Sequence, residues 1–209
     1  MFRIAVITAA VCALCVGCST VGKIQMRVDD MTGSKVITLD LEHTSKEKMP
    51  GLLSPRYDCL TKYAREIKPT NSEVIRVTLV TRTCVECDDI TDNAIVKAND
   101  EKFEIKLVDR VVEVKTEISS TTETTHQARA DGFVDYSKPG NSKTTTSSQS
   151  WKEMRGKIAI TPEMKKSLLA ANTITYRIYS GTNPITFDLK PEDVVKVKKL
   201  LLTDGSDIK

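Results

Sequence analysis

A sustained alternation of apolar and polar residues in the middle of the chain most constrains its fold. It runs from Phe103 to Thr125 and separates two sets of side chains, with Val112, Val114, Thr116 and Ile118 on one face and Glu113, Lys115 and Glu117 on the other. A period of two residues predicts a β-strand with one buried face. Beyond Ile118 the apolar face continues as Ser120, Thr122 and Thr124, so the strand outlasts its apolar side chains.

The same pattern returns in mirror image after the turn-rich segment RADGFVDYSKPGN. The stretch SKTTTSSQS is polar, and Met154, Ile158 and Ile160 then restore an apolar face. Because Thr is a good strand former, the symmetric fade predicts a β-hairpin arm over about residues 110–160 that starts in the core and projects into water. A disordered, mucin-like Ser/Thr linker is the alternative.

An aromatic cluster is expected at the tip of this hairpin. Phe133, Val134 and Tyr136 lie there among Asp, Gly, Lys and Pro. Exposed aromatic side chains are typical of contact sites, so the tip is a candidate surface for an envelope protein partner or for a membrane interface. The alternative is that these side chains fold back onto the hairpin or are simply mobile.

The remaining patterns predict short strands and three helices. Alternation predicts strands near 24–28, 36–41, 74–80, 173–180 and 185–189, and helices are expected over 54–67, 162–171 and 191–201. Each helix begins at a Pro, which loses no hydrogen bond in the first turn. Strands joined by turns, with helices between hairpins, predict an α+β fold: a mostly antiparallel sheet with about three helices and the projecting hairpin, in one domain over 23–209.

The start of the chain predicts export. Residues 4–18 are apolar or small and follow Arg3, a run too short for the roughly 20 residues of a membrane-spanning helix. A basic start, a short apolar run and small residues at its end are typical of a secretory signal peptide, here residues 1–17. Cys12 and Cys15 would be removed with this signal peptide.

The end of this run resembles the lipobox of bacterial lipoproteins. Val16, Gly17 and Cys18 match the pattern of that family, whereas Cys15 stands where Leu is usual. The resemblance covers residues 1–18 and implies that Cys18 carries diacylglycerol and a further acyl chain, which together anchor a protein stably. Ser19 after the lipidated Cys implies the outer membrane of the bacterial cell envelope. An ordinary signal peptide with an incidental Cys is the alternative.

A short tether is expected between the lipid and the fold, over residues 18–22. About four residues precede the first predicted strand, and at roughly 3.5 Å each they reach about 14 Å. Without residues 1–17 the chain keeps 30 basic and 28 acidic residues, because Arg3 is the only charge removed. This balance argues against nucleic acid as a partner.

Three cysteines remain beyond the anchor: Cys59, Cys84 and Cys87. An oxidising compartment favours a disulfide, and we expect a structural bridge from Cys59 to Cys84 or Cys87, with a Cys84–Cys87 link as the next alternative. The Cys-x-x-Cys spacing also fits a redox pair. Such a pair needs a helix N-terminus to lower the thiol pKa, whereas this one follows a predicted strand.

The linear motifs of enzymes are missing from the sequence. No nucleophile elbow, zinc-protease motif or phosphate loop occurs, and His43 and His126 have no paired spacing for a metal. We therefore predict no cofactor and a non-catalytic lipoprotein that binds another envelope component. The alternatives are a periplasmic thiol-redox protein that uses Cys84 and Cys87, and a carrier of a small ligand.

Overall fold

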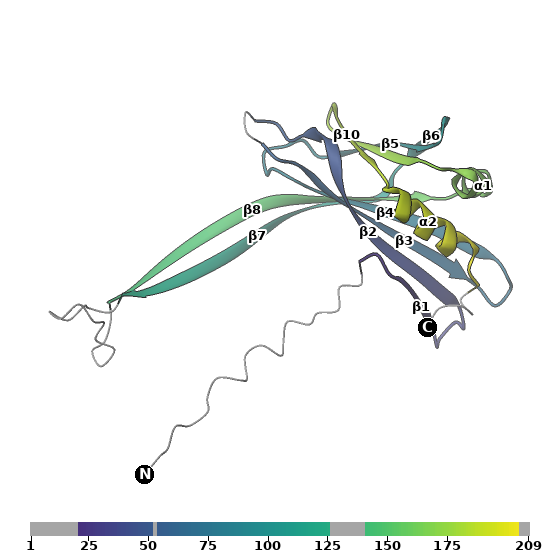
Figure 1. Ribbon diagram of the computed structural model, residues 1–209, viewed down its shortest axis with the longest axis horizontal. Helices are drawn as coiled ribbons and strands as arrows, with labels where there is room; N and C mark the ends of the chain where they lie inside the picture. The colour runs from purple at the N-terminus through teal and green to yellow at the C-terminus, as the bar shows by residue number, and fades with distance from the viewer. Residues whose placement is uncertain (1–20, 52–53, 126–140, 205–209) are drawn as a thin grey trace, which may run out of the picture.

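The computed structural model describes residues 21–51, 54–125 and 141–204. Strands dominate these residues, and every strand pair is antiparallel. A six-stranded sheet has the order β1-β2-β3-β4-β8-β7, and a four-stranded sheet has the order β10-β9-β5-β6. Figure 1 shows the smaller sheet at one end of the larger one, with β7 and β8 reaching far beyond the rest of the molecule.

The six-stranded sheet is built from long strands. They are β1 (Ile24–Val28), β2 (Lys35–Lys48), β3 (Arg56–Ile67), β4 (Glu73–Thr83), β7 (Val108–Thr125) and β8 (Asn141–Ala159). The predicted N-terminal hairpin is confirmed as β1 and β2, which pair from Ile24 opposite Leu39 to Val28 opposite Lys35. The predicted strand at 74–80 is confirmed within β4.

The smaller sheet and the helices cover one face of this sheet. The smaller sheet contains β5 (Ile90–Ala98), β6 (Glu101–Lys106), β9 (Ile174–Ser180) and β10 (Asn183–Asp188), and the helices are α1 (Pro162–Ala170) and α2 (Pro191–Leu202). Figure 1 shows α2 lying across β2 and β3. We call the covered side of the six-stranded sheet its inner face and the other side its outer face.

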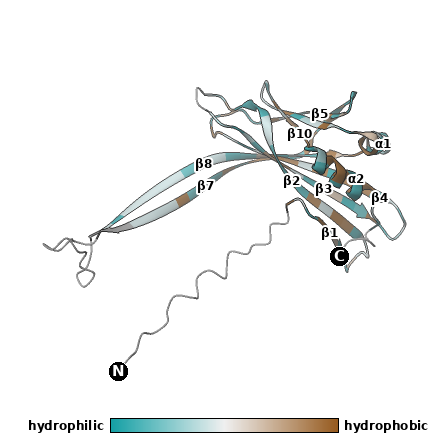
Figure 2. Cartoon of the chain, viewed as in Figure 1, coloured by the Kyte–Doolittle hydropathy of each residue, from teal (hydrophilic) through white to brown (hydrophobic). Residues whose placement is uncertain are grey.

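The core lies between the inner face, the smaller sheet and α2. Alternate residues of β2, β3 and β4 point into it, and β9, β10 and α2 close it from the other side. The largest fully buried side chains are mostly aliphatic with a few aromatic rings: Tyr57, Tyr63, Tyr176, Phe187, Ile37, Leu39, Leu41, Leu79, Met154, Ile158, Leu168 and Ile174. Brown segments in Figure 2 mark this apolar interior on the strands of the body and on α2.

The predicted α+β class with about three helices is wrong, because the fold is dominated by sheet and its described residues contain two helices. The error lies at 54–67, where the expected helix is strand β3. Its residues alternate between buried and exposed from Tyr57 to Arg65, the period of a strand. The helices expected near 162–171 and 191–201 are confirmed as α1 and α2.

The chain joins the fold close to its predicted lipidation site. The amide of Gly22 donates a hydrogen bond of 2.7 Å to the carbonyl of Asp40, so residue 22 is already attached to β2. Cys18 lies outside the described residues. Across the described ranges, neither α1 nor α2 has the length and apolar character that would let it cross a membrane.

Candidate functional site

The long hairpin formed by β7 and β8 is the candidate site. The two strands pair from Val111 opposite Arg155 to Thr125 opposite Asn141 without a break in register, as the alternation predicted. β4 pairs with β8 only from Lys152 to Ala159. Residues 115–125 of β7 and 141–151 of β8 therefore extend beyond the sheet as a two-stranded ribbon, which we call the arm.

The arm projects a surface that the fold itself does not cover. Residues 116–122 and 142–150 are all exposed, and from Asn141 to Trp151 the ribbon spans about 33 Å at roughly 3.3 Å per residue. Val114 at its start is 58% exposed and Ile118 is 70% exposed. The face expected to point inward is therefore not buried, because Val112 is already 36% exposed and no residue of β7 belongs to the core. Figure 2 shows the arm as mostly pale, which marks residues of intermediate hydropathy.

Hydroxyl pairs join the two strands of the arm. The Thr116 and Ser150 hydroxyls lie 2.9 Å apart, those of Ser119 and Ser147 2.7 Å apart, and those of Thr122 and Thr144 3.0 Å apart. Each cross-strand pair of this kind contributes roughly 0.2–1 kcal/mol. The Ser and Thr residues therefore hold the ribbon together without a hydrophobic core, and the mucin-like alternative is wrong for these residues.

Charged side chains fix the outer side of the arm where it leaves the sheet. Arg155 donates hydrogen bonds to Glu153 and Glu113, and Lys115 pairs with Glu113 at 2.6 Å. Lys115 and then Arg155 lower the pKa of Glu113 below its ordinary value. The Arg82 guanidinium lies 5.5 Å from the ring centre of Trp151, a cation–π distance. The sole Trp of the chain therefore stands at the start of the arm.

A disulfide braces the other side of this junction. Cys84 and Cys87 are bonded to each other in the loop between β4 and β5, and Cys59 is free and buried. The expected bridge from Cys59 is therefore not formed. The alternative, a link between Cys84 and Cys87, is formed instead. Cys59 faces the core from β3 opposite Thr81, whose hydroxyl lies 3.7 Å from its sulfur atom. Cys84 lies three residues after Thr81, beyond the end of β4.

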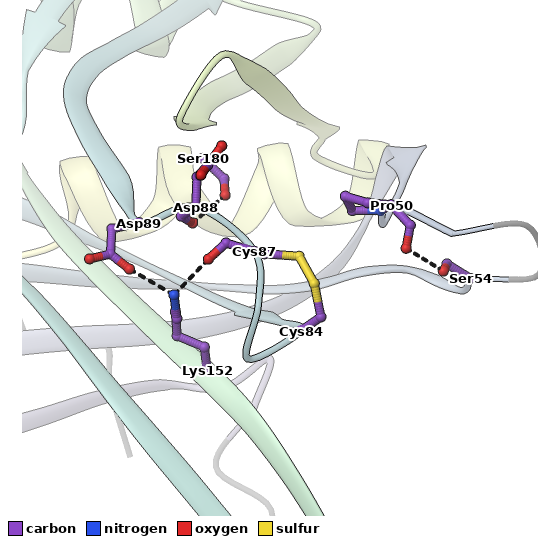
Figure 3. Close-up of a disulfide and its surroundings, with 8 residues drawn as sticks. All are labelled: Pro50, Ser54, Cys84, Cys87, Asp88, Asp89, Lys152 and Ser180. Atoms are coloured by element: carbon purple, nitrogen blue, oxygen red, sulfur yellow. Dashed lines mark hydrogen bonds and ion pairs between the residues drawn. A yellow bond between two sulfur atoms is a disulfide. The ribbon is translucent and has the colours of Figure 1, made fainter.

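Lys152 ties the arm to the disulfide loop. Its Nζ donates to the carbonyl of Cys87 at 2.6 Å and to the Asp89 carboxylate at 2.8 Å. Figure 3 shows this side chain pointing from β8 to both oxygen atoms. On the opposite side of the loop, the Ser180 hydroxyl donates to the carbonyl of Asp88, and the Gly181 amide donates to that of Asp89. The loop thus connects the arm to the smaller sheet.

The base of β7 is fixed separately. Asp109 has a positive φ of 50° where the register shifts between Val108 and Val111, which marks a β-bulge. Arg110 donates to the carbonyl of Ile90 at 3.1 Å, and Lys157 pairs with Asp109 at 3.0 Å. Both strands of the arm are therefore held at their base by side chains that reach β5 or its preceding loop.

The surroundings of the disulfide favour a structural role over redox chemistry. Cys84 follows a strand rather than opening a helix, so no helix dipole acts on it. Cys87 is 7% exposed, and Asp88 and Asp89 follow it directly. Within the described ranges, no three His, Cys, Asp or Glu side chains are grouped so that they could hold a metal ion.

A surface hollow lies beside the junction. It has a volume of about 520 Å³ and is lined by residues of β2, β3, β4 and β8 and by Lys190 before α2. Glu42, Asp58 and Glu153 line it together with Arg82 and Lys190, so it presents both signs of charge. The pocket expected for a small-ligand carrier was to lie between sheet and helices, whereas the lining of this hollow comes from neighbouring strands of the six-stranded sheet and from Lys190.

Comparisons with known proteins place the chain in no family. Neither a protein-family model, nor a curated protein, nor a solved structure matches it. Phe133, Val134 and Tyr136, the contact residues expected at the hairpin tip, lie outside the described residues. The sequence signalled the arm through its alternation, but the Lys152 bridge to the disulfide loop left no linear signal.

Proposed function

We propose that this protein is a lipid-anchored lipoprotein of the bacterial cell envelope whose arm binds another envelope component without catalysis. The observation that carries the binding role is the exposure of the arm. Residues 116–122 and 142–150 are exposed on both faces of the ribbon, although Lys152 and Arg110 fix its base. A ribbon that is fixed at its base and exposed beyond it is suited to contact with a partner.

The anchor is supported by the match of Val16, Gly17 and Cys18 to the lipobox and by the place where the fold begins. Gly22 is bonded to β2, and four residue steps separate it from Cys18. At roughly 3.5 Å per step the bilayer surface would lie within about 14 Å of Gly22. The tether would therefore hold the body at the membrane and restrict the directions in which the arm points.

The anchor is tested by mass spectrometry of the chain purified from its native envelope. We expect an N-terminus at Cys18 that carries acyl mass, and we expect Cys18→Ala to move the protein from the membrane fraction to the soluble fraction. An intact leader, or a processed N-terminus without acyl mass, would contradict the anchor.

The binding role is tested by removing the arm. Val114 and Lys152 are opposite each other in the register, so a two-residue Asn-Gly turn can join them in place of residues 115–151. The armless body should keep its Tm within a few degrees, because the removed residues pack against nothing in the core. Affinity capture from native envelopes should lose partners relative to the intact chain. An unchanged set of partners would contradict the role of the arm.

A further inference from the structure

The edges of the arm carry backbone groups without a strand partner. β7 is the last strand of its sheet, and β8 pairs on its other side with β4 only as far as Lys152. From residue 143 to 151, β8 therefore has an open edge within the described part of the chain, and β7 has one along its whole described length. Exposed N–H and C=O groups of this kind form a template for another strand.

The register identifies the residues that present these groups. The Ile160 amide donates to the carbonyl of Ile75 on β4, so even-numbered residues of β8 direct their backbone groups to that side. Backbone direction alternates along a strand, and the β7–β8 register is regular through the arm. The outward amides are therefore those of Thr144, Thr146, Ser148 and Ser150 on β8 and of Thr116, Ile118, Ser120 and Thr122 on β7.

The middle of the arm lacks the features that usually protect an open edge. Natural edge strands carry Lys, Pro or bulges that prevent pairing with another chain. Residues 118–122 and 144–150 contain no charge and no Pro, and the bulge of β7 lies at its base near Val108. A Thr-rich, uncharged strand has high β propensity and no charge repulsion against a second copy of itself.

The two edges are complementary in direction. Copies anchored in one membrane would project their arms to the same side, and this step rests on the proposed function. β8 of one copy then runs antiparallel to β7 of its neighbour, which continues the pattern within each hairpin. Such a head-to-tail contact uses two different edges, so each copy can bind two others.

We propose that the partner of the arm is a second copy of this chain, joined to it by backbone pairing between the outer edge of β8 at 143–151 and the outer edge of β7. The contact extends the ribbon from two strands to four or more. Two strands alone are marginally stable in water, and additional strands stabilise such a ribbon. The neutral Ser and Thr side chains point to the two faces of the widened sheet, so they do not obstruct the pairing at its edges.

Two proline substitutions test the pairing. Ser120→Pro and Ser148→Pro remove one outward amide from each edge and leave every inward hydrogen bond of the hairpin in place. The matched control is Ser120→Ala with Ser148→Ala, which removes the same hydroxyls and keeps both amides. Co-expressed full-length copies with two different tags are captured through one tag from solubilised membranes, and the second tag is quantified.

We expect the wild-type chain and the Ala pair to co-capture equally, within about twofold, and the Pro pair to fall about tenfold. If wild-type copies do not co-capture each other, that result alone overturns the proposal, whatever the variants show. It would also be overturned by a Pro pair that co-captures normally, by an Ala pair as depleted as the Pro pair, or by an arm-dependent partner that is a different protein.

Mass spectrometry of the captured chain separates this inference from the anchor. Acylated copies that remain single would contradict the pairing alone. Copies that pair but carry no acyl group would contradict the anchor and support the pairing. Fluorescence of Trp151, the sole Trp of the chain, checks that the arm is intact at its base in each variant.

Discussion

The hydroxyl oxygen of Tyr63 lies 2.9 Å from that of Tyr176, and this hydrogen bond joins the two sheets at the centre of the core. Tyr63 belongs to β3 and Tyr176 to β9, and both side chains are fully buried. Their rings meet edge to face with centroids 6.5 Å apart. Because a buried hydroxyl needs a partner, the pair fixes how the sheets pack. Burial raises the pKa of both phenols well above the ordinary range.

Removing one hydroxyl of this pair should destabilise the fold because it leaves the other hydroxyl buried without this partner. Tyr63→Phe and Tyr176→Phe should each cost about 2 kcal/mol of the free energy of unfolding. The double variant leaves no hydroxyl of the pair unpaired, so it should lose less than the sum of the two single losses. Urea unfolding measures all three values, and a double variant that loses the full sum would contradict the pairing.

His43 should make the stability of the fold depend on pH between about 4 and 6.5. Burial lowers its pKa to about 4, with a nearby Lys190 acting in the same direction and Asp193 against it. Its Nε2 lies 3.0 Å from the Thr61 hydroxyl, its Nδ1 has no partner among the described residues, and its ring stacks on Phe187.

The sign follows from proton binding. Between pH 6.5 and 4 the unfolded chain binds a proton at His43 that the folded chain does not, so stability falls as the pH falls through this range. The loss reaches about 3 kcal/mol at pH 4 and is constant below it. Urea unfolding at several pH values should show a slope that His43→Gln removes. A variant with the wild-type slope would exclude His43 as its source.

The sequence predicted the arm because its signal is local. Alternation from Val112 to Ile118 and the polar stretch SKTTTSSQS specify two strands whatever the rest of the chain does. The same holds for α1, where Thr161 accepts a hydrogen bond from the Met164 amide as an N-cap before Pro162. Elements fixed by neighbouring residues can be read from a sequence.

The sequence misled at β3 because long-range contacts decide its pattern. Its inner face includes Thr61 and Arg65, whose burial depends on His43 and on carbonyls at the end of α2. Its outer face carries Leu60 and Ala64, which are half-buried. Because these polar residues lie on the inner face and these apolar residues on the outer face, the sequence of β3 does not alternate between apolar and polar residues. Its apolar residues instead recur at the spacing expected of a helix. The same error placed Cys59 on a helix.

Cys59 should be inert in the folded protein. Burial raises the pKa of its thiol to about 12, so almost no thiolate exists at pH 8. A thiol reagent should label the oxidised mature chain once, and only after unfolding in denaturant. Rapid labelling of the native protein would contradict the burial of Cys59. Cys59→Ala supplies the control, since it should show no labelling in either state.

Gly181 should tolerate no side chain. Its φ is +57°, and a Cβ atom built on it would lie 2.2 Å from Oδ2 of Asp88 in the disulfide loop. Gly33 is the matched control, because its φ is +67° but the nearest atom, Cγ of Pro69, would be 3.5 Å away. Gly33→Ala should cost about 1 kcal/mol from backbone strain alone. Gly181→Ala should cost about 2–3 kcal/mol, with Tm as the measurement, because it also displaces the loop.

Reducing the disulfide should weaken the fold without abolishing it. The bond closes a loop of only four residues, so the chain-entropy contribution is about 2 kcal/mol. Lys152, Ser180 and Gly181 still hold the loop when the bond is open. Cys84→Ser with Cys87→Ser should therefore lower the free energy of unfolding by about 2 kcal/mol and keep the circular dichroism spectrum and the Trp151 emission. Adding Lys152→Ala should then shift Trp151 emission, because the base of the arm loses the Lys152 contacts with the loop. If that emission stays the same, Lys152 does not connect the arm to the disulfide loop.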